Sequence, residues 1–224
     1  MMRCVFLFLC LCLQNGWLFS EEEQQHGLNF EQYVIDAFTG RGYTADWDLP
    51  GFANPRVPGV PVSIKLMQEG HTIYFSDALR QRRLRGEFQL VIGFYRKIPE
   101  AQKIEILHLH NLRIRPQEWE KIWGDVTVEM LEAFQEEIKR GSVEEAQAFA
   151  RKRAAELRKL SRGMKIFPKI NRQQRRIQCG MDYEFFCRTF IGTARPERQE
   201  ELRLYEMKFP RFLPAAPRHW WGES

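Results

Sequence analysis

The sequence predicts a mixed fold of the α/β (α+β) class. An apolar run from Phe88 to Tyr95 has the composition of a central buried strand. Residues 60–66 and 103–110 alternate apolar and polar side chains, as half-buried strands do. Most strand patterns lie in the first half of the chain, and helical patterns dominate after residue 116. We therefore expect a mixed central sheet flanked by helices, with a helical and basic C-terminal half.

The elements follow in order along the chain. Apolar residues at helical spacing predict a first helix that begins after Asn29 and ends at Gly40. An extended segment from Tyr43 to Asp48 comes next, followed by a Pro- and Gly-rich loop that ends at Pro61. The remaining expected elements are a strand over 60–66, a strand over 72–75, a helix over 77–85 capped by Ser76, strands over 88–95 and 103–110, helices over 116–123, 128–138 and 142–160, the segment 163–170, and a strand over 176–187.

Charge is distributed unevenly over the 224 residues. The net charge is +5, but the stretch from Arg151 to Arg176 contains eleven Lys and Arg against one acid, Glu156. This stretch therefore carries +10, and the rest of the chain carries −5. Such segregation predicts one surface for a polyanion, although a solvated helix face would also explain residues 151–162. No run approaches the ~20 apolar residues of a membrane span.

The N-terminus differs from the rest of the chain. A short basic start and the apolar run Cys4–Leu13 have the outline of a secretory signal peptide. The alternatives are a start codon assigned too far upstream or a buried N-terminal segment. We therefore separate residues 1–25 from a core over 26–112 and a helical, basic elaboration of the same domain over 113–224. The protein is expected in the cytoplasm, or outside the cell if residues 1–20 act as a signal peptide.

Several acids and a lysine are spaced as in a metal-dependent hydrolytic site. Asp48 ends the extended segment, and Ser63 and Lys65 project from one face of the following strand. Glu31 lies on the first helix, and Asp77 lies at a strand-to-helix junction. Converging carboxylates can bind a hard cation such as Mg²⁺ through oxygen. A lysine beside them can orient or deprotonate a water for attack on phosphorus.

At Asp48 and at Val62-Ser63-Ile64-Lys65 the chain resembles the PD-(D/E)xK nuclease superfamily, in particular type II restriction endonucleases. The resemblance extends from Phe30 to Tyr95 and includes the order of helix, strand, hairpin strand and buried strand. It implies a restriction-endonuclease-like fold and Mg²⁺-dependent hydrolysis of double-stranded DNA to 5′-phosphate and 3′-hydroxyl ends. It also implies that Asp48 binds the metal and that Lys65 assists the attacking water.

Two partners follow from the same resemblance. A palindromic duplex target would favour a homodimer, because one site must act on each strand. A restriction system would also contain a cognate DNA methyltransferase.

Ser63 departs from the family pattern, which has Asp or Glu at this position. In some restriction enzymes with Ser here, a neighbouring element supplies the acid. In this chain the candidates are Asp77, Glu31 and, less favoured, Glu69. The alternative is a catalytically inactive DNA-binding protein on a nuclease scaffold.

Arg and Gln concentrate just before the last predicted strand. Arg can pair with guanine and Gln with adenine through two hydrogen bonds, so this composition favours contacts to bases as well as to phosphates. A second basic run after Asp77 suits phosphates around the scissile bond. A remaining alternative is a secreted protein whose basic helix binds polyanions. The expected DNA-binding residues are Lys169, Arg172, Gln173, Gln174, Arg175 and Arg176 in the first run, and Arg80, Arg82 and Arg83 in the second.

Overall fold

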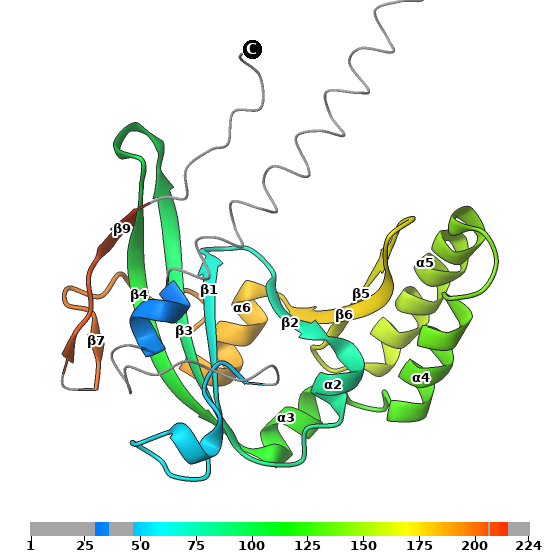
Figure 1. Cartoon of the computed structure of the whole chain (residues 1–224), viewed down its shortest axis with the longest axis horizontal. Helices are drawn as coiled ribbons and strands as arrows, with labels where there is room; N and C mark the ends of the chain where they lie inside the picture. The colour runs from blue at the N-terminus through cyan, green and yellow to red at the C-terminus, as the bar shows by residue number, and fades with distance from the viewer. Residues whose placement is uncertain (1–29, 36–46, 206, 215–224) are drawn as a thin grey trace, which may run out of the picture. The chain divides into compact units, whose positions relative to one another are not determined.

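The computed structural model describes residues 30–35, 47–205 and 207–214 (Figure 1). The expected separate segment 1–25 lies outside these residues. The chain forms two compact units, each assembled from segments that are distant in sequence. Both units therefore draw on residues from each side of the expected boundary at 112. Unit 1 consists of the described residues up to Gln68, Leu90–Asn111 and the described residues from Glu197 onward, and unit 2 consists of Glu69–Gln89 and Leu112–Pro196.

The fold is mixed α/β, as expected from the strand and helix patterns. Unit 1 is built on a four-stranded sheet with the order β1-β3-β4-β9. β1 is an edge strand that buries every second side chain at its start, and the first eight residues of β3 are all buried. The strands are β1 (Val62–Gln68), β3 (Phe88–Ile98), β4 (Lys103–Ile114) and β9 (Phe212–Pro214), with the short pair β7 (Arg203–Leu204) and β8 (Met207–Lys208) beside them in sequence.

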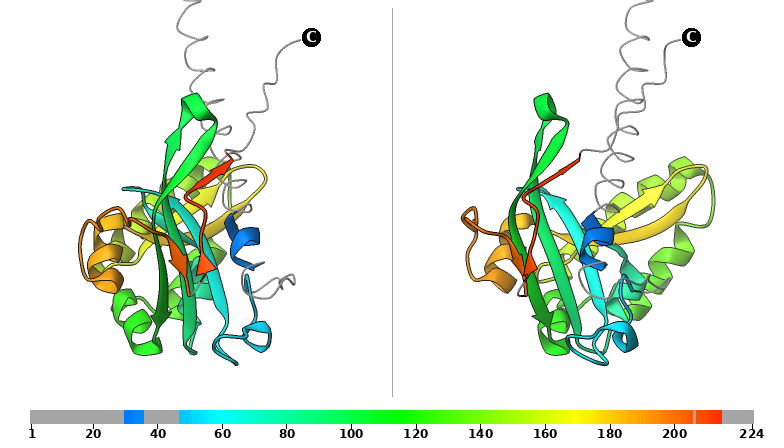
Figure 2. Two further views of the ribbon diagram at one scale, coloured as in Figure 1. Left: turned by 90° about the vertical axis from the view of Figure 1, so that its left-hand side faces the viewer. Right: turned by 60° about the vertical axis from the view of Figure 1, so that its left-hand side comes forward.

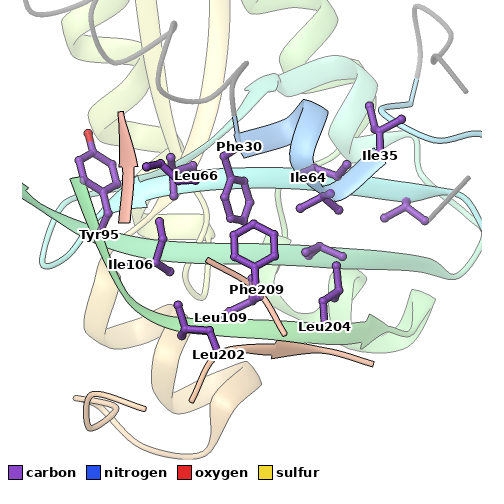
Figure 3. Close-up of a cluster of buried hydrophobic side chains, with 14 of the residues drawn as sticks. Phe30, Ile35, Ile64, Leu66, Tyr95, Ile106, Leu109, Leu202, Leu204 and Phe209 are labelled. Atoms are coloured by element: carbon purple, nitrogen blue, oxygen red, sulfur yellow. The ribbon is translucent and has the colours of Figure 1, made fainter. Parts of the chain in front are cut away.

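A single hydrophobic cluster holds the sheet of unit 1 and residues 30–35, which are helical (Figure 3). The ring of Phe30 is fully buried and lies 5.3 Å from that of Phe209. Gly93 in β3 makes room for it, because a Cβ atom there would lie 2.8 Å from the Phe30 ring. The cluster therefore fixes the first helical turn, including Glu31, against the central strands.

Unit 2 contains a three-stranded antiparallel sheet with the order β2-β6-β5 (Figure 2). The strands are β2 (Ile73–Asp77), β5 (Lys165–Ile170) and β6 (Arg175–Met181). The helices are α2 (Ala78–Arg82), α3 (Pro116–Trp123), α4 (Val128–Glu137), α5 (Val143–Leu160) and α6 (Tyr183–Phe186), which leads into a π-helical turn over Cys187–Ile191.

The long helix α5 begins and packs as its sequence predicts. Ser142 and Glu145 form the capping box expected at its start. Small residues at helical spacing, Ala146, Ala150 and Ala154, are buried on the face that packs against β5. Arg151, Lys152, Arg158 and Lys159 of the same helix are exposed. No helix in the described part of the chain is long and apolar enough to cross a membrane.

Three local expectations are corrected. Asp77, not Ser76, caps α2, because its carboxylate accepts a hydrogen bond from the Arg80 amide at 2.7 Å. Ser76 follows a β-bulge, is paired with Cys179 of β6 and has a positive φ. The strand expected over 176–187 ends at Met181, because the next buried residues have helical spacing. Asp48 lies in a bend rather than at a strand end, and residues 43–46 of that expected strand lie outside the described part.

Candidate active site

Asp48 is held against the outer edge of β1. Leu49 exchanges two backbone hydrogen bonds with Val62, at 3.1 and 2.8 Å, so the chain around Asp48 runs beside this edge strand. The edge leaves the amide of Ile64 without a strand partner on that side, and this amide donates to Oδ2 of Asp48. The carboxylate is therefore positioned by backbone geometry that the alternation of β1 alone does not reveal.

Ser63 and Lys65 also donate to Asp48. The Ser63 hydroxyl lies 3.3 Å and Nζ of Lys65 lies 3.4 Å from the same oxygen, Oδ2. Nζ donates in addition to the carbonyl of Ile64 at 2.8 Å. Three donors thus converge on Oδ2, while Oδ1 has no hydrogen-bond donor among the described residues. One carboxylate oxygen is fixed and the other is open to a further ligand.

Glu31 is the second acid of this site. It is half-buried next to Phe30, and no described residue donates a hydrogen bond to its carboxylate. Burial, and then the negative charge of Asp48, raise its pKa to about 7, and the positive charge of Lys65 opposes the rise. Asp48 and Lys65 are therefore the charged groups whose electrostatic effects reach Glu31. Glu31 on the first helical turn, Asp48 in the bend, and Ser63 and Lys65 on β1 thus all belong to the same segment of unit 1, the described residues up to Gln68.

The other two acids considered for this role belong to unit 2. Asp77 and Glu69 lie in the segment Glu69–Gln89, and the carboxylate of Asp77 already caps α2. Among the described residues, no group of three or more His, Cys, Asp and Glu side chains has the arrangement of a metal site. Among the described residues of unit 1, the acids considered for this site are therefore Glu31 and Asp48.

The chain was compared with known proteins, and no family model, curated protein or solved structure matches it.

The basic run on α2 is largely engaged within unit 2. Arg82 is buried, and its guanidinium donates to the carbonyl of Val126 at 2.7 Å and to Glu120 at 3.0 Å. Arg83 pairs with Glu132. Arg80 is exposed at the start of the helix. Of the three residues expected to bind DNA here, the contacts of Arg82 and Arg83 hold α2 to the neighbouring helical segments.

The other residues expected to bind DNA, in the run from Lys169 to Arg176, lie on the hairpin formed by β5 and β6. Lys169 and Arg176 lie opposite each other on the two strands, and Arg172 and Gln173 lie in the connecting turn. Gln174 closes this turn, because its carbonyl accepts from the Asn171 amide at 2.9 Å and its own amide donates to Asn171 Oδ1 at 2.8 Å.

Arg175 differs from its neighbours in the same run. Its Nη1 atom lies 3.0–3.3 Å from the carbonyl oxygens of four successive residues, 138–141, at the C-terminal end of α4. These carbonyls have no partners within the helix, and a cation there also complements the helix dipole. The position of Arg175 is that of a helix cap, which residue type alone could not distinguish from a DNA contact.

Most of the remaining cations in this part of unit 2 have no acidic partner. Between Arg151 and Arg176, the ion pairs found in the described residues involve only Arg153, with Glu156, and Lys165, with Asp182. A surface with this many unneutralised cations costs electrostatic free energy unless it meets a polyanion. The exposed cations without a carboxylate partner are Arg151, Lys152, Arg158, Lys159, Arg162, Lys169, Arg172 and Arg176.

Proposed function

We propose that the protein is a Mg²⁺-dependent endonuclease that hydrolyses phosphodiester bonds in double-stranded DNA, with Glu31, Asp48 and Lys65 as its catalytic groups. The observation that carries the proposal is the ion pair of Asp48 with Lys65 on the edge of β1, with one Asp48 oxygen open to a further ligand. Glu31 is a half-buried second acid whose pKa responds to both charges. This arrangement agrees with the resemblance to PD-(D/E)xK nucleases except that Ser63 replaces an acid and that Trp47, not Pro, precedes Asp48.

The residues of the site suit Mg²⁺. Mg²⁺ is commonly held by one or two carboxylates together with waters and substrate phosphates. Glu31 and Asp48 would hold it. Burial, and then the charge of Asp48, raise the pKa of Glu31, and a bound cation would favour its charged form against both effects. When bound, Mg²⁺ supplies positive charge that stabilises the developing charge on the phosphate oxygens.

Each protein group then has a separate role. Asp48 presents its free oxygen because Ser63, Ile64 and Lys65 hold the other one. Lys65 is fixed by the Asp48 carboxylate and the Ile64 carbonyl, and it orients the attacking water by donating a hydrogen bond. Ser63 positions Asp48, and Glu31 takes the place of the acid that the family pattern has at position 63.

The unpaired cations of unit 2 would bind the DNA backbone. Neutralising phosphates with Lys and Arg releases counterions, which makes such binding strong and salt-dependent. A palindromic site would be cut by a two-fold homodimer that brings one active site to each strand. As a restriction enzyme, the protein would act in the cytoplasm beside a methyltransferase that protects the host sites.

Because Ser63 replaces the acid of the family pattern, the alternative function is that of a DNA-binding protein that has lost catalysis. Supercoiled plasmid incubated with Mg²⁺ or with EDTA separates the two. The nuclease should produce nicked or linear DNA with 5′-phosphate and 3′-hydroxyl ends in Mg²⁺ and none in EDTA. Binding in a gel-shift assay without cleavage in Mg²⁺ or Mn²⁺ would establish the inactive alternative.

A further inference from the structure

The outer part of the hairpin formed by β5 and β6 is a two-stranded ribbon. β2 pairs with β6 only from Gln178 to Met181, whereas β5 pairs with it from Arg175 to Gly180. Residues 168–177 therefore form a ribbon without a third strand. The major groove of B-DNA is wide enough to admit a two-stranded ribbon of this kind.

The ribbon is held rigidly from one side. Gln135 on α4 takes the place of a third strand, because its side chain donates to the Arg175 carbonyl at 2.8 Å and accepts from the Ile177 amide at 3.1 Å. Gln147 on α5 donates to the Ile170 carbonyl at 3.0 Å. With Arg175 capping α4 as well, the ribbon is a fixed projection rather than an independent hairpin (Figure 2).

The two faces of the ribbon have different compositions. Ile166, Ile177 and Cys179 are buried on the face toward the helices. On the opposite face, Lys169 is paired in register with Arg176 within the ribbon. Phe167 is paired with Gln178 at the base of the ribbon, where β2 begins to pair with β6. Residues paired across antiparallel strands project to the same side, so these four side chains share the outer face.

This outer face is costly for stability and suited to DNA. Two cations directly opposite each other on neighbouring strands repel, and neither Lys169 nor Arg176 has an acidic partner in the described residues. The set consists of an arginine, a lysine, a glutamine and a half-exposed phenylalanine, whose ring also lies 5.1 Å from that of Tyr74 on β2. Arg and Lys recognise guanine, Gln recognises adenine, and an aromatic ring can contact the thymine methyl group.

We propose that the β5–β6 ribbon enters the major groove of DNA and that Arg176, Gln178, Lys169 and Phe167 determine sequence specificity through contacts to base edges. This inference rests on the proposed DNA substrate but not on catalysis. It divides the basic stretch by role: the ribbon face reads bases, the cations of α5 contact phosphates, and Arg175 caps α4. The register of the strands adds Phe167 and Gln178, which the composition of the basic run did not single out.

The base contacts are tested by selection from a duplex DNA pool with a randomised central segment. Protein carrying Lys65→Ala, with the ribbon otherwise intact, is used in Mg²⁺ so that bound DNA is not cut, and the bound fraction is sequenced. Arg176→Ala and Gln178→Ala should each reduce discrimination at particular base pairs by about tenfold or more. The matched control, Arg151→Ala on α5, should weaken binding to all sequences and leave the consensus unchanged.

Three results of the selection experiment would overturn the inference. It fails if the pool yields no consensus, if the ribbon variants keep the consensus, or if duplex RNA competes as well as DNA, since the major groove of RNA is too narrow for a ribbon. Thermal unfolding of each variant shows that it is folded. Plasmid cleavage by the wild type is scored separately, so a protein that selects sequences but never cuts would refute the nuclease and leave the ribbon inference standing.

Discussion

Nζ of Lys65 lies 3.4 Å from Oδ2 of Asp48, and each side chain is less than a quarter exposed. The same lysine atom donates to the carbonyl of Ile64, the residue whose amide also binds Asp48. Lysine and carboxylate are thus positioned by a single peptide segment of β1. Such preorganisation matters because a catalytic group must be held in its productive geometry before the substrate arrives.

Glu31 predicts how stability depends on pH in metal-free protein. Its pKa rises from 4.5 to about 7 through burial and the nearby charge of Asp48. Between these values the folded state retains a proton that the unfolded state has lost, so the free energy of unfolding should fall as pH rises. Glu31→Gln removes this effect and should be more stable than wild type at pH 8, by about 1–3 kcal/mol.

Urea unfolding at pH 5 and pH 8 in EDTA measures this difference. Glu100→Gln, an exposed acid of the same unit, is the control and should behave like wild type. Mg²⁺ should stabilise the wild type at pH 8 but not Glu31→Gln. Identical pH profiles for wild type and Glu31→Gln would mean that Glu31 is not in a desolvated, negatively charged site.

Ser63 is predicted to assist the site without binding metal. Its hydroxyl contributes one of three hydrogen bonds to Asp48. Losing one such bond costs about 0.5–1.5 kcal/mol, so Ser63→Ala should slow cleavage only about two- to tenfold. The ratio of the plasmid cleavage rates of wild type and Ser63→Ala at saturating Mg²⁺ measures this effect. A complete loss of activity in a folded Ser63→Ala protein would instead make the hydroxyl indispensable.

Glu105 predicts sensitivity to acid in unit 1. Its buried carboxylate accepts two hydrogen bonds from Arg198, at 2.9 and 2.7 Å, and one from Arg96 at 2.7 Å. Burial alone would raise the pKa of Glu105, but the hydrogen bonds from Arg198 and then Arg96 outweigh it and hold the pKa below 4.5. The stabilisation is therefore complete above pH 4.5 and is lost as pH falls through the lower folded-state value.

Glu105→Gln should cost about 1.5–3 kcal/mol at pH 7, the range for hydrogen bonds to charged groups, because Arg96 and Arg198 are more than half exposed. The difference from wild type should shrink as pH falls below 4.5, as measured by urea unfolding. Parallel curves at all pH values would show that the charge of Glu105 contributes nothing.

Arg175 is predicted to act in stability rather than in DNA binding. Arg175→Ala removes the cation that contacts the carbonyls of residues 138–141, directly after α4, and it should lower the free energy of unfolding by about 1–3 kcal/mol. At temperatures where the variant is folded, its affinity for plasmid DNA and the salt dependence should match wild type. Arg172→Ala, an exposed neighbour, should show the reverse pattern. Weaker DNA binding by folded Arg175→Ala would contradict the capping role.

The sequence predicts elements well where one pattern dominates. The alternation from Val62 onward and the capping box at Ser142 correspond to β1 and α5. Prediction fails where two neighbours suit the same position. Ser76 and Asp77 are both good N-cap residues, and only the β-bulge before α2 determines which of them caps the helix. The β-forming residues after Met181 become helical because their burial follows the helical period.

The residues of the candidate site could be predicted from the sequence only where they lie close together along the chain. Local spacing associates Asp48, Ser63 and Lys65, because the edge of β1 brings them together. Glu31 and Asp77 could not be ranked, since the choice depends on how Phe30 packs beside Gly93, far away in sequence. Likewise, the sequence of the basic run contains nothing that separates Arg175 from Arg176, because their roles depend on which side of β6 each one projects.

The most direct test of the central claim is plasmid cleavage by purified wild type, Asp48→Asn and Lys65→Ala in Mg²⁺, with Lys103→Ala as an exposed-lysine control from unit 1. We predict that wild type and Lys103→Ala cut equally. We also predict that each site variant binds DNA but cuts at least about 100-fold more slowly, the lower range for loss of an acid–base group. Cleavage by both site variants at the wild-type rate would contradict the account.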